Sequence, residues 1–145
     1  MGDPQVVDFD LDVTSDGALT LAEPVSGEGR YVRNDQGSPR FGHIRLTLAP
    51  YLAGPRRYRS EWRVPEGFLP LTFMPTASLD GVKVALGESF LGGVPVAFLC
   101  AAVTDGSYHD TDTDEAAVAI AASMAVKDAL RRGRLVRPWS GRTKG

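Results

Sequence analysis

Residues 96–133 read VAFLCAAVTDGSYHDTDTDEAAVAIAASMAVKDALRRG, and this stretch decides the fold. It opens with a continuous apolar run over residues 96–104, rich in β-branched and aromatic side chains, which is typical of a strand buried on both faces. A short polar segment containing Gly106 follows and predicts a loop. The remainder is rich in alanine and apolar almost all round, so a helix formed there could lie very close to a sheet. The stretch therefore predicts a central strand, a loop and a tightly packed helix.

Both ends of this helix are marked by charged residues. Asp112 and Glu115 form a D-x-x-E pattern, which is similar to a capping box and predicts the start of the helix. Arg131 and Arg132 suit the negative end of the helix dipole, and Gly133 is a natural stop. We therefore expect the helix to run from Asp112 to Gly133.

Strict alternation of apolar and polar residues predicts strands in the first half of the chain. The segments VVDFDLDV (6–13) and ALTLAEP (18–24) are expected to close an acidic hairpin. Residues 28–64 are expected to form an antiparallel meander with one arginine-rich face. The residues of that basic face are Arg30, Arg33, Arg45, Arg57, Arg59 and Arg63.

The period changes in the middle of the chain, where Leu79, Val82 and Leu86 form a helical stripe within residues 75–89. Strands followed by helix, strand and helix predict an α+β domain in which two helices cover one face of a mixed sheet. We expect three parts: an acidic N-terminal hairpin packed on the domain, the domain itself, and a C-terminal tail. Their boundaries are residues 1–27, 28–138 and 139–145.

The composition suits one globular domain. The chain has 145 residues, 43% of them hydrophobic, and no apolar run approaches the ~20 residues that span a bilayer. The single cysteine, Cys100, lies in the apolar run and is expected to be a buried side chain that fills space in the core. A lone cysteine and the absence of a signal-like N-terminus together indicate that the protein is located in a reducing cytosol.

Charge is divided into blocks along the chain. The net charge is −2, but residues 29–63 carry eight arginines against two acids, and residues 129–145 carry six basic residues and no acid. Arginine suits phosphate because its planar guanidinium donates several hydrogen bonds. Ordinary solvated faces explain the same pattern without any nucleic acid.

The sequence argues against a metal centre. Asp110, Asp112 and Asp114 resemble the opening of a calcium loop, but the sixth position is Glu115 rather than glycine and the twelfth is Ala121 rather than glutamate. A zinc site needs three or four ligands, and only one histidine is near. The acids are better explained as caps of a helix, so we expect no metal and no cofactor.

Catalysis is not supported either. Ser107 and His109 share a turn but have no third orienting group in the sequence, and no nucleophile elbow is present. Neither a P-loop nor a dinucleotide-binding fingerprint occurs, so we expect no bound nucleotide. The features that remain are two short polar loops, NDQGSPRFGH (34–43) and DGSYHD (105–110). Their Ser38, Arg40, Tyr108 and His109 could contact phosphate or stack on bases.

The sequence also resembles a known family. LGGVPVAFLCAAVTDGSYHDTDTDEAAVAIAASMAVKDALRRG (91–133) resembles the second half of domain IV of bacterial elongation factor G, in which a strand, a D-G-S-Y-H tip and a helix with an IA.SMA core follow one another. YVRNDQGSPRFGHIRLTLAP (31–50) resembles the first tip loop of the same domain, which ends in aromatic-Gly-His. The resemblance covers about residues 28 to 138.

This resemblance implies a fold like that of domain 2 of ribosomal protein S5, with two helices on one face of a mostly antiparallel sheet and a left-handed βαβ crossover. It also implies that the domain is a fingertip that contacts RNA. Tyr108, His109 and Asp110 correspond to the second loop of that fingertip, and Gly37 and Ser38 to the first. Pro39 departs from the family pattern by removing an N–H donor.

We therefore expect a stand-alone, non-catalytic module that binds RNA, with the ribosome or its rRNA as the partner, in the cytoplasm, and with no membrane and no nucleotide as partners. The alternative is a protein-interaction module that pairs through its arginine-rich face or its acidic hairpin with a partner protein or with a second copy of itself. A third alternative is an enzyme built on the same fold.

Overall fold

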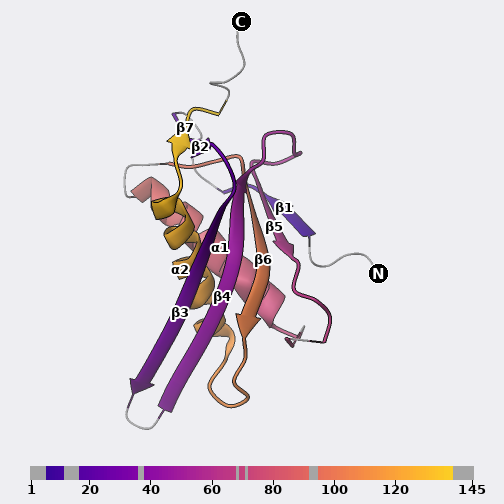
Figure 1. The fold of residues 1–145 in the computed structure, drawn as a ribbon, viewed down its shortest axis with the longest axis vertical. Helices are drawn as coiled ribbons and strands as arrows, with labels where there is room; N and C mark the ends of the chain where they lie inside the picture. The colour runs from indigo at the N-terminus through magenta and orange to yellow at the C-terminus, as the bar shows by residue number, and fades with distance from the viewer. Residues whose placement is uncertain are drawn as a thin grey trace, which may run out of the picture.

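A computed structural model describes residues 6–11, 17–35, 38–67, 69–70, 72–91 and 95–138. Two helices lie side by side against one face of a five-stranded sheet, and two short strands form a second sheet near the C-terminal end of the described chain (Figure 1). The elements are β1 (Val6–Phe9), β2 (Thr20–Leu21), β3 (Val25–Asp35), β4 (Ser38–Pro50), β5 (Tyr58–Trp62), α1 (Met74–Leu91), β6 (Leu99–Ser107), α2 (Glu115–Arg132) and β7 (Leu135–Val136).

The large sheet has the strand order β1-β5-β6-β4-β3. Strands β3 and β4 form a long antiparallel hairpin, and β6 pairs antiparallel with β4 and parallel with β5. Helix α1 connects β5 to β6, so these three elements form a βαβ unit. The α+β prediction, with two helices on a mixed sheet, is confirmed; the hand of the crossover stays a prediction.

Two predicted strand pairings are wrong. The predicted meander over residues 28–64 is interrupted, because β6 lies between β4 and β5. The predicted N-terminal hairpin does not form either, since β1 pairs with β5 and β2 pairs with β7. Alternation of apolar and polar residues predicts a strand and its two faces, but it contains no information about the neighbouring strand.

The sheet has an open face, which is the face opposite the two helices. Leu99, Ala101 and Val103 of β6 are buried against the helices, whereas Cys100 and Ala102 point to the open face and are only partly buried. The prediction of a strand buried on both faces is therefore wrong, because both helices cover the same side. Desolvation still raises the pKa of the Cys100 thiol to about 11, which keeps it protonated and unreactive at neutral pH.

Helix α2 packs very closely on the β3–β4 hairpin. Gly27, Gly29 and Gly42 lie beneath backbone carbonyls of the helix, and a Cβ atom at any of these glycines would overlap one of them. For Gly29 the overlapping atom is the carbonyl oxygen of Ala121. Alanines on the helix and glycines on the strands together permit this approach, as the alanine content of the helix predicts.

The predicted start of α2 is displaced by two residues. The N-cap is Asp114, whose Oδ1 accepts a hydrogen bond of 2.8 Å from the backbone N–H of Ala117. This bond and the ion pair with Arg40 hold the pKa of Asp114 below its usual value. The end at Gly133 is confirmed, since its N–H donates to the carbonyl of Ala129 at 3.0 Å. Among the described residues, no helix has the length and apolar character needed to cross a membrane.

Candidate nucleic-acid interface

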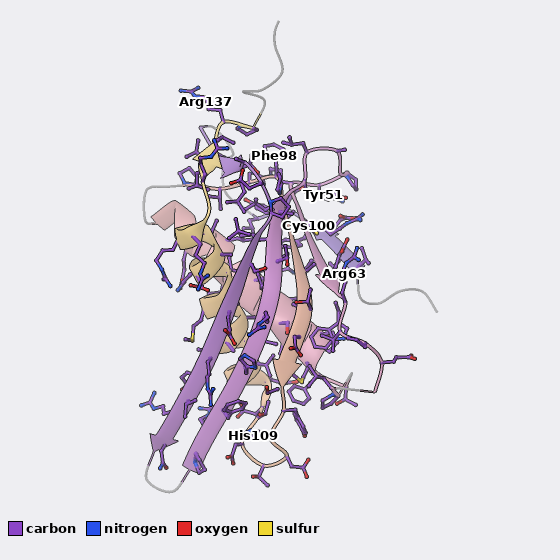
Figure 2. The ribbon with its side chains drawn as sticks, in the orientation of Figure 1. Tyr51, Arg63, Phe98, Cys100, His109 and Arg137 are labelled. Atoms are coloured by element: carbon purple, nitrogen blue, oxygen red, sulfur yellow. The ribbon has the colours of Figure 1, made fainter. Side chains whose placement is uncertain are left out.

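The two loops singled out in the sequence lie together at one end of the molecule. We call this end the tip: the described residues 30–35 and 38–43 of the β3–β4 hairpin, and residues 105–113, which comprise the last three residues of β6 and the loop that leads to α2. Figure 1 shows the end of the hairpin beside the loop, and Figure 2 shows His109 in that loop, far along the sheet from Cys100 and Tyr51. Gly37 lies outside the described residues, and Ser38 begins β4 opposite Asp35.

A direct contact joins the two parts of the tip. The ring of His109 stacks on the ring of Phe41 with 3.9 Å between centroids and 4° between planes. The backbone N–H of Phe41 donates a 2.9 Å hydrogen bond to the carbonyl of Asp112. Because Phe41 is buried and His109 is exposed, the histidine ring sits on a fixed platform while it remains accessible to solvent.

The backbone of the second loop is closed by a compact turn. The carbonyl of His109 accepts hydrogen bonds from the N–H groups of Asp112 and Thr113, and the N–H of His109 donates to the hydroxyl of Thr113. Thr113 is buried. The tip therefore holds the backbone of His109 from both sides. Sequence reasoning did not identify Thr113, although a threonine just before a helix N-cap is a recognisable turn signal.

The arginine content of the tip is concentrated on the hairpin. Arg30 is exposed, and its guanidinium lies over the Phe41 ring, 5.6 Å from the centroid. Arg40 pairs with Asp114 at 2.9 Å. Arg33 is exposed, but it faces the helix side of the sheet rather than the open face, since it pairs in register with Arg40 and follows Gly29 and Tyr31 at two-residue intervals. The predicted basic face therefore does not include Arg33.

Acidic residues and Tyr108 occupy the other side of the tip. Asp110 is exposed, and Asp112 accepts a hydrogen bond from Thr111. Tyr108 is partly buried, with its ring 6.2 Å from that of Phe73, so it belongs to the packing beneath the loop. The tip thus has a basic hairpin side and an acidic loop side, with His109 between them.

A network of polar side chains crosses the sheet at the base of the tip. Nδ1 of His43 lies 2.9 Å from the hydroxyl of Ser107, and Nε2 lies 2.5 Å from a carboxylate oxygen of Glu28. Arg45 donates to the same oxygen at 3.2 Å. Hydrogen bonds from His43 and Arg45 hold the pKa of Glu28 below its usual value. The network ties β3, β4 and β6 together where both loops begin.

Three other arginines of the predicted basic face are paired with acids at the opposite edge of the sheet, which we call the β1–β5 edge. Arg59 binds Asp8 through two hydrogen bonds of 2.8 and 3.0 Å. Arg57 donates from both its backbone N–H and its Nε to Asp10, each at 3.0 Å. Arg63 pairs with Glu61. The arginine-rich face exists, but strand β1 neutralises much of it.

Two arginines of this edge lower the pKa values of Asp8 and Asp10. The side-chain hydrogen bond from Arg59 lowers the pKa of Asp8, and the backbone N–H of Arg57 is the main cause that lowers the pKa of Asp10. Both shifts favour the charged carboxylates, so each pair is stabilised above the pH at which these acids titrate.

Comparison with known proteins identifies the family. The family model of elongation factor G, domain IV, matches residues 19–134. This chain belongs to the elongation factor G domain IV family. Elongation factor G of Petrotoga mobilis is 34% identical over 118 residues, and that of Thermotoga petrophila is 36% identical over the same length. Each alignment covers 81% of this chain and 17% of the relative.

A solved structure from Thermus thermophilus has the same fold, with a TM-score of 0.72 and 32% identity over 82% of this chain and 17% of that one. The resemblance inferred from the tip loops is therefore confirmed, and this chain spans about a sixth of the length of its elongation factor relatives. Strand β1 precedes the matched residues, so Asp8 lies outside the part that the family model describes, whereas Arg57 and Arg59 lie within it.

Proposed function

We propose that this translation-related module binds RNA through its tip, with the ribosome as its partner in the cytoplasm and without catalysing a reaction. The observation that carries the proposal is the platform formed by Phe41, whose ring contacts both the exposed His109 ring and the guanidinium of Arg30. An imidazole and a guanidinium on a rigid support suit nucleic acid, since both can stack on bases and both can donate hydrogen bonds to phosphate.

Rigidity supports the same proposal. The Phe41–Asp112 backbone bond, the turn closed by Thr113 and the network around His43 hold Phe41, the second loop and the base of the tip in place before any partner arrives. A binding surface that is already ordered loses less conformational entropy when it binds. The tip can therefore gain useful affinity from a few contacts.

The alternative of association through opposed charges has less support. Asp8 and Asp10, which that alternative would offer to another chain, are paired with Arg59 and Arg57 of the same chain. Pairing between two chains would first break these contacts. The structure thus favours contacts through the tip over contacts through the β1–β5 edge.

Co-sedimentation with small ribosomal subunits over a series of salt concentrations tests the proposal. Several phosphate contacts predict that affinity falls by about 10³-fold between low and moderate salt. The variant His109→Ala should bind more weakly than the wild type. Arg134→Ala is the matched control, because Arg134 is an exposed arginine paired with Glu23 outside the tip. A response that is flat with salt, or equal losses in both variants, would refute the proposal.

A further inference from the structure

A small cavity lies beneath the β1–β5 edge, between the sheet and helix α1. Its volume is about 70 Å³. Side chains from β1, β5, β6 and α1 line it, and the polar ones include hydroxyl groups. The lining residues that matter here are Val7, Ser60, Trp62, Thr76 and Ser78.

Two of the lining side chains carry buried polar atoms without a protein partner. The indole Nε1 of Trp62 and the hydroxyl of Ser78 have no hydrogen-bond partner within the described part of the chain. Trp62 is 6% exposed and Ser78 is 1% exposed. Buried polar groups are almost always satisfied in folded proteins, by protein atoms or by ordered water. Two residues that line the same cavity each carry such an atom, and this points to a shared ligand.

We propose that the cavity is a binding site for small neutral hydrogen-bonding molecules, which in the free protein are water molecules that bridge Trp62 and Ser78. The indole N–H can only donate, so its partner must accept, while the Ser78 hydroxyl can donate or accept. Water satisfies both. The hydroxyls of Ser60 and Thr76 line the same space and offer further partners.

The volume and the wall chemistry set the class of ligand. A water molecule occupies about 30 Å³ in the liquid, so the cavity holds about two of them. A purely apolar molecule would leave both polar atoms unpaired. An anion is disfavoured because none of the described residues that line the cavity is basic. Small neutral molecules with both a donor and an acceptor remain.

Strand β1 forms one side of this site. Val7 of β1 forms part of the wall, and β1 is held to β5 by strand pairing and by the Asp8–Arg59 pair. The same strand that pairs with the arginines also forms part of the cavity wall.

Nuclear magnetic resonance can detect such water directly. We expect a cross-relaxation peak between water and the indole N–H proton of Trp62, with the sign that marks a residence time longer than about a nanosecond. The variant Trp62→Phe assigns the signal, since the chain has two tryptophans. Absence of the peak in the folded wild-type protein would overturn the proposal.

A double-mutant cycle tests the bridging. Each of the variants Ser78→Ala and Trp62→Phe should lower the urea midpoint of unfolding. If water links the two side chains, the double variant should lose less stability than the sum of the losses in the two single variants. Additive effects, or a rise in stability with Ser78→Ala alone, would show two independent unpaired groups and contradict a shared ligand.

Discussion

The tip and the β1–β5 edge use the same residue type in opposite ways. At the edge, Arg57 and Arg59 are less than one third exposed and each meets a carboxylate of β1 or of the residue that follows it. At the tip, Arg30 is exposed and contacts the ring of Phe41. An arginine already paired with a carboxylate has little to offer a phosphate, whereas one that lies over an aromatic ring keeps its N–H groups available.

The difference teaches that counting arginines on a face does not locate a binding surface. Strand β1 brings Asp8 opposite Arg59 in the sheet register, and its two-residue period also carries Asp10 to Arg57. The edge therefore gains stability from its charges. The tip keeps the groups that can contact a partner.

The largest expected effect comes from removing the support of the tip. Gly29→Val should lower the free energy of unfolding by about 3 kcal/mol, because the new side chain overlaps the carbonyl of Ala121 and pushes α2 off the hairpin. Urea unfolding measures the loss. Gly87→Ala in α1 is the control, since a Cβ there meets no atom within 4 Å and should stabilise the helix by up to ~1 kcal/mol. Similar results for both variants would contradict the close packing.

The next effect concerns binding alone. The double variant Arg30→Ala/His109→Ala should weaken binding to small ribosomal subunits by about 10- to 100-fold, because it removes a phosphate contact and a stacking surface. Its urea midpoint should change little, since both side chains are exposed. Fluorescence anisotropy of the labelled protein measures the affinity. Unchanged affinity would place the binding surface elsewhere.

At the β1–β5 edge we expect a substitution to reduce stability and to leave binding unchanged. Arg59→Ala should lower the free energy of unfolding by about 1–2 kcal/mol, because Asp8 loses both of its hydrogen bonds from Arg59. Affinity for small ribosomal subunits should stay within about twofold of the wild type, since this arginine is already paired. A large loss of affinity with unchanged stability would reverse the assignment of the two regions.

The smallest effect is a pH dependence of stability. The pKa values of Asp8 and Asp10 are lowered in the folded protein, so their pairs contribute stability above about pH 4 that is lost as the pH falls through the lowered values. The urea midpoint of the wild type should therefore fall as the pH is lowered from about 5 to about 3. The fall should be shallower in Asp8→Asn/Asp10→Asn, and an identical slope would show that these pairs do not contribute.

The sequence predicts those parts of the fold that depend on local order. The apolar run, the D-G-S-Y-H segment and the alanine-rich helix are consecutive, so the order of strand, loop and helix in residues 96–133 could be predicted. The boundary between strand and loop was misplaced, because β6 continues to Ser107, three residues into the predicted loop. The partners of β1 and β5 could not, because pairing joins residues about fifty positions apart. One feature of the sequence does indicate this pairing: Asp8 and Asp10 are two residues apart, and so are Arg57 and Arg59.

The same limit applies to the candidate site. His109 could be identified from its place in the loop, but its stacking on Phe41 depends on how the two loops pack against each other. The true N-cap, Asp114, was one of three alternating aspartates, and only the backbone geometry selects among them. A functional role that depends on contacts between distant parts of the chain can therefore be identified only from the structure.

Hydrogen–deuterium exchange of the protein bound to small ribosomal subunits most directly tests whether the tip, and not the edge, contacts RNA. We predict slower exchange in residues 30–43 and 105–113 of the complex, with residues 6–11 and 56–63 unchanged. Slower exchange confined to residues 6–11 and 56–63, with the tip unchanged, would contradict the division of roles between these two regions.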